Sequence, residues 1–191
     1  MKKVGLLGGT FDPPHLGHLI MAEEARLKKK LDEIWWMPNH IPPHKKLASG
    51  ISEQDRIKLV AKAAELHPAY RLCTLEMERS GPSYTVDTVR LLQKEYSNKQ
   101  FYFIMGGDSL NNFHKWYKYD QLKEMIPFIV ISRPGFLISD ADAPSRMTVL
   151  DDVSVELSST YIRKSLKEGA INRFVLPEGV YEYIKENHLY E

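Results

Sequence analysis

Two histidines three positions apart follow a glycine-rich turn near the N-terminus. Residues 8–18 read Gly-Gly-Thr-Phe-Asp-Pro-Pro-His-Leu-Gly-His. Gly8 and Gly9 let the backbone approach a ligand closely, and exposed backbone N–H groups there can donate to phosphate oxygens. His15 and His18 lie at a helix start, so both imidazoles fall on one face beside the positive end of the helix dipole. This combination predicts a phosphate-binding site.

The pair of histidines has two other interpretations. It could belong to a surface helix start without function, or it could bind a metal ion. A metal site is disfavoured because no third Cys, His or Asp lies at a suitable local spacing. The glycine pattern of a dinucleotide site and the Gly-Lys-Ser/Thr of a Walker P-loop are both absent. We therefore predict a phosphate site that holds no resident metal.

A second candidate phosphate contact lies at 158–163, which reads Ser-Ser-Thr-Tyr-Ile-Arg. Ser159 and Thr160 at a helix start offer hydroxyls and free backbone N–H groups to phosphates. Arg163 lies one turn further on the same face and supplies a fixed positive charge. Alone, the run that starts at Ser158 could be only a helix cap. Together with the first motif it is a more specific signal.

The elements that must position these residues alternate between strands and helices. Apolar runs predict strands at 4–7, 34–37, 70–75, 101–105, 128–131 and 148–150. Helical periodicity and capping residues predict helices at 17–31, from 52, from 82, at 158–167 and at 177–187. This succession predicts an α/β fold of Rossmann-like type, an open and mainly parallel sheet with helices on both faces. We expect one domain over 1–191, with a C-terminal helical part from about residue 158.

Apolar positions also predict which face of two helices is buried. In the helix over 17–31 the expected stripe consists of Leu16, Leu19, Ile20, Leu27 and Leu31. In the helix that starts near Ser52 it consists of Ile57, Val60, Ala61 and Ala64.

Four of the predicted strands end in polar or glycine-rich turns, at 8–10, 38–40, 106–108 and 132–133. The carboxyl ends of parallel strands share one edge of a sheet, and ligands bind along that edge. We therefore expect the four turns to converge on one site.

Composition narrows the class of protein. A hydrophobic content of 43% and a charged content of 27% are ordinary for a globular chain. A net charge of +1 argues against broad binding to nucleic acid or to an acidic membrane, so any anion site must be local. The chain has no apolar stretch of about 20 residues, and Asp12-Pro13-Pro14 ends the first apolar run too early for a signal peptide. The single Cys73 fits a reducing compartment, so we expect a cytoplasmic protein.

The motifs resemble those of a known superfamily. Residues 9–18 follow the pattern Gly-x-Phe-x-Pro-x-His-x-Gly-His, which resembles the phosphate-binding motif of the nucleotidyltransferases, related to the His-Ile-Gly-His motif of class I aminoacyl-tRNA synthetases. Residues 158–163 are similar to a second superfamily element. Within the superfamily the whole chain most resembles the bacterial nicotinate-mononucleotide adenylyltransferases. The stretches that carry this likeness are 8–15, 38–45, 82–88, 106–109, 116–117 and 176–177.

The resemblance implies roles for individual residues. It places His15 and His18 at the triphosphate around the reacting phosphorus, and Lys45 and Arg163 at the leaving pyrophosphate. The implied ATP contacts are Gly8, Gly9, Thr10, Phe11, His15, His18, Gly106, Asp108, Ile131, Ser132, Arg133, Ser158, Ser159, Thr160 and Arg163. The implied contacts to nicotinate mononucleotide are Thr10, Lys45, Thr85, Asp108, Trp116 and Tyr117.

Several of these residues have a plainer interpretation. Lys45 could be a solvated loop lysine, Asp108 a helix cap, and Trp116 and Tyr117 core aromatics. Only the neighbouring motifs favour the functional assignment.

The resemblance also implies a reaction, the transfer of AMP from ATP to nicotinate mononucleotide in NAD biosynthesis. The products are nicotinate adenine dinucleotide (deamido-NAD) and pyrophosphate. Mg²⁺ is expected mainly on the ATP phosphates. Partners other than the two nucleotides are not expected, although aromatics near the C-terminus permit a homodimer. The alternatives are another adenylyl- or cytidylyltransferase, such as one acting on phosphopantetheine, and a non-catalytic nucleotide sensor.

Overall fold

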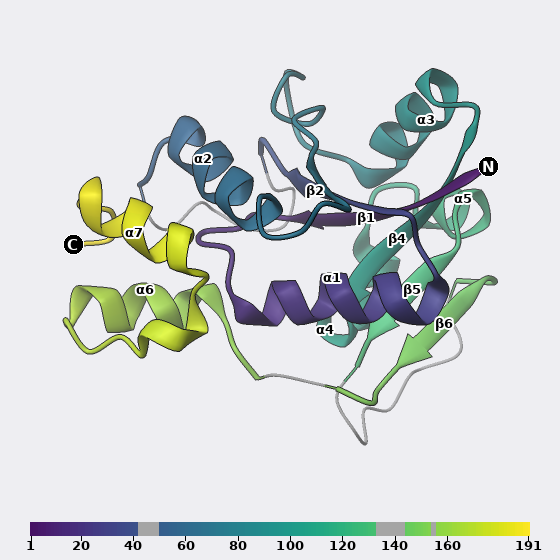
Figure 1. Cartoon of the computed structure of the whole chain (residues 1–191). Helices are drawn as coiled ribbons and strands as arrows, with labels where there is room; N and C mark the ends of the chain where they lie inside the picture. Colours follow the sequence, from purple (N-terminus) through teal and green to yellow (C-terminus); the bar gives the residue numbers. More distant parts are fainter. Residues whose placement is uncertain (42–49, 133–143, 154–155) are drawn as a thin grey trace.

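Parallel strands form one six-stranded sheet in the computed structural model of the chain, which describes residues 1–41, 50–132, 144–153 and 156–191 (Figure 1). The strands are β1 (Lys2–Gly9), β2 (Glu33–Pro38), β3 (Tyr70–Leu72), β4 (Lys99–Gly106), β5 (Phe128–Ile131) and β6 (Met147–Leu150). Their order is β3-β2-β1-β4-β5-β6, and all pairs are parallel. The predicted α/β class and parallel sheet are confirmed.

Helices cover both faces of the sheet. They are α1 (Leu16–Lys29), α2 (Glu53–Ala64), α3 (Thr85–Glu95), α4 (Gly107–Asn111), α5 (Tyr119–Met125), α6 (Ser159–Lys167) and α7 (Glu178–Glu186), with short 3-10 turns η1 (Phe113–Lys115) and η3 (Arg173–Val175). One core cluster joins the sheet to α1, α2, α6 and α7, and a second joins it to α3, α4 and α5. The strands are therefore buried on both sides, which explains their continuous apolar runs.

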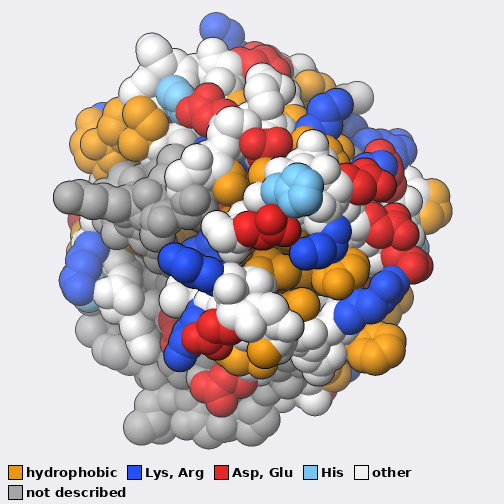
Figure 2. Space-filling model, turned by 90° about the vertical axis from the view of Figure 1, so that its left-hand side faces the viewer, with side chains coloured by type: hydrophobic (Ala, Val, Ile, Leu, Met, Phe, Trp, Pro, Cys, Tyr) orange, Lys and Arg blue, Asp and Glu red, His pale blue; other side chains and the backbone are white. Residues whose placement is uncertain are grey.

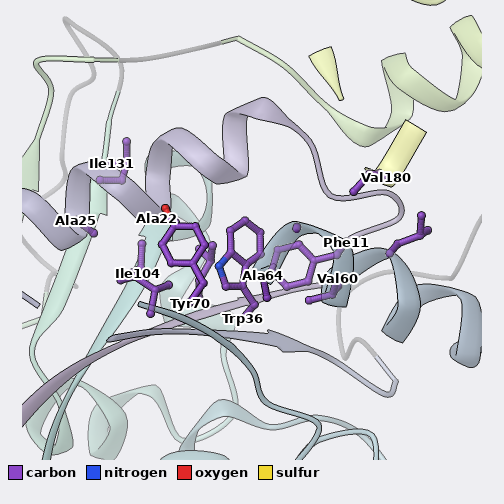
Figure 3. Packing of buried hydrophobic residues seen from close by; sticks show 14 of the residues in the cluster. Phe11, Ala22, Ala25, Trp36, Val60, Ala64, Tyr70, Ile104, Ile131 and Val180 are labelled. Carbon is purple, nitrogen blue, oxygen red and sulfur yellow. The ribbon is translucent and has the colours of Figure 1, made fainter. Parts of the chain in front are cut away.

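The first core cluster contains a row of aromatic rings beside the N-terminal loop. The ring centroid of Phe11 lies 5.5 Å from that of Trp36, which lies 5.7 Å from that of Tyr70. Figure 3 shows these rings packed side by side near Val60 and Ala64 of α2. Because Phe11 lies two residues beyond the end of β1, this packing anchors the loop that leaves the strand.

The predicted buried stripe of α1 is partly wrong, although Leu31, just beyond the end of the helix, is buried as predicted. The buried residues of the helix are Ala22 and Ala25, whereas Leu27 is 55% exposed and Leu16 is 37% exposed. Small side chains on the inner face let α1 lie close to the sheet, whose own large side chains fill the core. In α2 the prediction is partly wrong, because Ile57 and Ala61 are only half-buried. The buried residues of this helix are Arg56, Leu59, Val60, Ala63 and Ala64.

Most predicted elements are present, with shifted ends. The helix predicted from residue 82 begins at Thr85, and the strand predicted over 70–75 ends at Leu72. Helices α4 and α5 were not predicted, because five and seven residues are too few for a clear helical period. Within the described ranges, no helix is long and apolar enough to span a membrane.

Candidate active site

A cavity of about 850 Å³ opens at the carboxyl edge of the sheet, between β1 and β4. The chain order of the strands reverses at this pair, and such a switch point is where open α/β sheets bind ligands. Three of the four turns predicted to converge here contribute to its lining. The lining includes Gly8, Gly9, Thr10, Phe11, His18, Met21, Asn39, Glu76, Ser83, Tyr84, Thr85, Gly106, Asp108, Trp116, Tyr117 and Ser159.

The segment Gly8–His18, which we call the phosphate loop, has a shape set by its buried side chains. Phe11 has a positive φ of 50° and is 2% exposed, and its ring meets the His18 ring edge-on at 5.0 Å. A Cβ on Gly9 would lie 3.1 Å from the Phe11 ring, so a side chain there would require this buried ring to shift.

The two histidines lie on one face, as their spacing predicted, and their rings are in contact. Their ring centroids are 3.8 Å apart with an interplanar angle of 32°. Nδ1 of His18 accepts a hydrogen bond of 3.2 Å from the backbone N–H of His15. In the neutral ring the proton is then on Nε2, which makes His18 a hydrogen-bond donor on a side chain that lines the cavity.

His15 is held as a neutral ring. It is 5% exposed, and burial lowers its pKa from 6.5 to about 4. Its Nδ1 is buried and has no hydrogen-bond partner among the described residues. At neutral pH His15 is therefore uncharged.

The second motif packs directly against the phosphate loop. Ser158 caps α6 by accepting from the backbone N–H of Tyr161 at 3.2 Å. The hydroxyl of Ser159 donates to the carbonyl oxygen of Pro13 at 2.9 Å, and Nη1 of Arg163 donates to that of Asp12 at 2.8 Å. The structure thus brings together two motifs that lie at opposite ends of the sequence.

Aromatic residues line the other end of the same cavity. The ring of Trp116 meets the ring of Phe103 edge-on at 5.8 Å, and Tyr117 is 44% exposed with its ring 4.4 Å from that of Tyr84. Trp116 and Tyr117 line the cavity together with Thr85, so they are not simply core aromatics.

Asp108 also lines the cavity, in the first turn of α4. The N-cap of that helix is Gly106, so the alternative of Asp108 as the helix cap is wrong.

Some predicted residues are placed elsewhere. Ile131 and Ser132 are buried at the end of β5, and neither lines the cavity. Lys45 and Arg133 lie outside the described residues, so their roles stay predictions. His15, Ser158, Thr160 and Arg163 do not line the cavity. His15 belongs to the phosphate loop, and the other three lie at the N-cap or in the first turns of α6.

Arg56, which is fully buried in α2, was not predicted as a site residue from the sequence. Its guanidinium donates to the carbonyl oxygens of Thr10, Asn39 and His40 at 3.2, 2.7 and 3.2 Å. It therefore ties the turn after β1 to the turn after β2. The only hint in the sequence is that this arginine falls within the apolar face of the helix. Because arginine side chains are mostly exposed in proteins, such a position is easily interpreted as solvated.

Glu76 was also missed, although it lines the cavity. It is 5% exposed, and one carboxyl oxygen accepts from Oγ1 of Thr88 at 2.7 Å. Burial raises the pKa of this carboxyl. Across the described parts of the chain, no three His, Cys, Asp or Glu side chains are grouped closely enough to hold a metal ion.

Comparison with known proteins agrees with this geometry. The cytidylyltransferase-like family matches residues 6–165. The chain is 45% identical to the nicotinate-nucleotide adenylyltransferase of Bacillus subtilis (strain 168) over 191 residues, which cover 100% of both chains. It is 47% identical, with the same coverage, to a probable nicotinate-nucleotide adenylyltransferase of Bacillus pumilus (strain SAFR-032).

Solved structures share the fold. The nicotinic acid mononucleotide adenylyltransferase of Plasmodium falciparum complexed with NaAD has a TM-score of 0.83 at 21% identity, covering 100% of this chain and 98% of that one. The Plasmodium falciparum structure complexed with APC has a TM-score of 0.81 at 22% identity, with the same coverage.

The buried His15 predicts a specific pH dependence of stability. The folded ring stays neutral down to about pH 4, whereas the unfolded ring takes up a proton below about pH 6.5. The unfolded state then binds more protons, so stability falls as pH drops from 6.5 to 4, by about 3 kcal/mol from this group alone. Urea unfolding of His15→Asn across this range should show a shallower slope than the parent. His114→Asn, at an exposed position, is the control, and its unfolding free energy should depend on pH as steeply as that of the parent. If both variants reduce the pH dependence equally, the buried His15 is not its cause.

Proposed function

We propose that this chain, which belongs to the nicotinate-nucleotide adenylyltransferase family, transfers AMP from ATP to nicotinate mononucleotide and releases pyrophosphate. The product is nicotinate adenine dinucleotide, an intermediate of NAD biosynthesis. Both substrates are nucleotides, in keeping with the ligands named for the similar Plasmodium falciparum structures.

One observation supports this reaction best. A single cavity runs from the phosphate loop to the aromatic pair Trp116 and Tyr117. The first end suits a triphosphate, because it presents backbone N–H groups, an imidazole N–H and a helix start. The second end suits a flat pyridine ring, which can stack on an aromatic face. Two nucleotides bound this way would meet at their phosphates.

The reaction depends on positioning the two substrates and needs no covalent intermediate with the protein. An oxygen of the 5′-phosphate of nicotinate mononucleotide attacks the α-phosphorus of ATP. The bond from that phosphorus to the bridging oxygen breaks, and the electron pair leaves with pyrophosphate. Negative charge builds up on the leaving group and on the equatorial oxygens, so preorganised donors lower the barrier. Nε2 of His18 is our candidate donor to the reacting phosphate, with His15 supporting it.

The leaving pyrophosphate would be held by residues at the start of α6. Arg163 and the hydroxyls of Ser159 and Thr160 lie at the start of α6, against the phosphate loop. Lys45 would add a further cation from the segment after β2. Arginine suits this role because its planar fork matches two phosphate oxygens at once.

Mg²⁺ would enter with ATP. The residues around the phosphate loop are mainly hydrogen-bond donors, which fit phosphate oxygens better than a bare cation. The described lining has two carboxyl groups, those of Glu76 and Asp108, and we propose that Asp108 would orient a water of the bound ion. When bound, Mg²⁺ neutralises charge on the phosphates.

We place the protein in the cytoplasm, on the expectation drawn from its single cysteine. The aromatic side chain of Phe174, which is 83% exposed, permits a homodimer.

The proposed function is tested by measuring pyrophosphate release with ATP and one of three acceptors. We expect turnover with nicotinate mononucleotide, slower turnover with the nicotinamide mononucleotide, and none with 4′-phosphopantetheine. A chain that binds ATP but forms no dinucleotide would instead be the nucleotide sensor. Turnover with phosphopantetheine alone would assign it to the other adenylyltransferase.

A substitution at His18 tests the role of the donor. His18→Ala should lower kcat by about 10²–10³-fold, because one preorganised donor to the transition state is lost. The thermal midpoint should stay close to that of the parent, since the His18 ring is only half-buried. His114→Ala, at an exposed site outside the cavity, serves as the matched control. A kcat of His18→Ala near the parent value would remove His18 from the mechanism.

A further inference from the structure

The last residues of the chain reach back to the phosphate loop. After α7 the backbone turns at His188 and Tyr190, whose φ values are 51° and 68°, and the N–H of Leu189 donates to the carbonyl oxygen of Ile184 at 3.0 Å. This turn directs the Tyr190 side chain inward, where it packs against the first core cluster. Its hydroxyl donates to Oδ1 of Asp12 at 2.8 Å.

Figure 1 shows the C-terminus beside α7 and next to α6, and Figure 2 shows this end of the molecule face-on. Acidic and basic side chains are interspersed on the visible surface there. The contact made by Tyr190 lies beneath that surface, because Asp12 is only 4% exposed.

Asp12 is surrounded by charged and polar groups from three parts of the chain. Arg163 of α6 faces it, Tyr190 of the C-terminal tail faces it, and Arg56 of α2 acts on it through its charge at longer range. Nη1 of Arg163 donates to the backbone carbonyl oxygen of Asp12 at 2.8 Å. The same atom lies 3.7 Å from the carboxylate Oδ2, which is too long for a hydrogen bond.

The Asp12 carboxylate is therefore held away from a full pairing with Arg163. A free carboxylate beside a guanidinium tends to form two short parallel hydrogen bonds, at about 2.7–2.9 Å. Here one carboxylate oxygen is already occupied by the Tyr190 hydroxyl. Burial and the charge of Asp12 raise the pKa of Tyr190 far above its usual value, so the hydroxyl remains a donor at any working pH.

We infer that Tyr190 is a positioning residue for adenylyl transfer: by holding the Asp12 carboxylate, its hydroxyl keeps Arg163 available for the phosphate oxygens of ATP. This inference rests on the proposed function. Without the hydroxyl, Asp12 can turn toward Arg163 and form the paired arrangement. Arg163 would then have to break a buried ion pair before it could bind phosphate.

The chain supplies a matched control for this contact. Tyr183, on α7, donates from its hydroxyl to Oδ1 of Asp55 at 3.0 Å. This is also a tyrosine–aspartate hydrogen bond that joins the C-terminal part to the body of the protein. Asp55 lies in the first turn of α2 and does not line the cavity. A purely structural effect should appear equally in both tyrosine-to-phenylalanine variants.

The first experiment compares Tyr190→Phe with Tyr183→Phe by steady-state kinetics, ATP titration and thermal unfolding. For Tyr190→Phe we expect kcat/KM for ATP to fall by about tenfold and the Kd for ATP to rise. KM for nicotinate mononucleotide should change by less than about twofold, because Arg163 faces the other substrate. Tyr183→Phe should match the parent in all kinetic constants. ATP constants of Tyr190→Phe equal to those of the parent, or equal losses in both variants, would overturn the inference.

A double variant tests whether the Asp12 carboxylate draws Arg163 into an ion pair. Adding Asp12→Asn to Tyr190→Phe removes the charge that draws Arg163 away, so the double variant should bind ATP more tightly than Tyr190→Phe alone. If each substitution instead weakens ATP binding independently, the losses add and the inference is wrong. All titrations are made well below the lowest thermal midpoint, so that only folded protein is compared.

ATP binding is measured without turnover, which separates this inference from the proposed function. A parent that binds ATP but makes no dinucleotide would contradict the function. The order of the ATP affinities among the variants would still decide the inference.

Discussion

The phosphate loop is irregular and yet buried, and this constraint shapes the structure around it. Phe11, Asp12 and His15 are each at most 5% exposed, so the carbonyl groups of this stretch have little access to water. Buried carbonyl groups need hydrogen-bond partners, and a loop without regular structure supplies few of its own. The partners come from distant elements of the fold. Arg56 binds the carbonyl of Thr10, Arg163 that of Asp12, and Ser159 that of Pro13.

In this arrangement some polar groups of the loop bind other parts of the protein, and others remain available to a ligand. Side chains of α2 and α6 take up the carbonyl oxygens of Thr10, Asp12 and Pro13, and backbone N–H groups bind those of Gly9 and His15. The groups left to face the cavity are donors suited to phosphate, among them the imidazole of His18. The side chains that satisfy the loop are also cationic in two of the three cases, so they set a positive field around it. Folding of the loop and preparation of the phosphate site are therefore the same physical event.

The sequence predicted the parts of the site that depend on local chemistry. The phosphate loop, the cap at Ser158 and the strand ends around the cavity all follow from residue types at short spacing. It could not predict Arg56 or Tyr190, because their partners are backbone or carboxylate oxygens many residues away. The inner face of α1 was missed for a related reason. A leucine such as Leu27 is exposed when a smaller residue gives closer packing against the sheet.

The central claim is that both nucleotides meet at the switch point between β1 and β4. The most direct test is a crystal structure of the protein with nicotinate adenine dinucleotide bound. The account predicts the diphosphate within hydrogen-bond distance of Nε2 of His18, with the pyridine ring against Trp116. A dinucleotide whose diphosphate lies away from the phosphate loop, or whose pyridine ring lies outside the cavity, would contradict it.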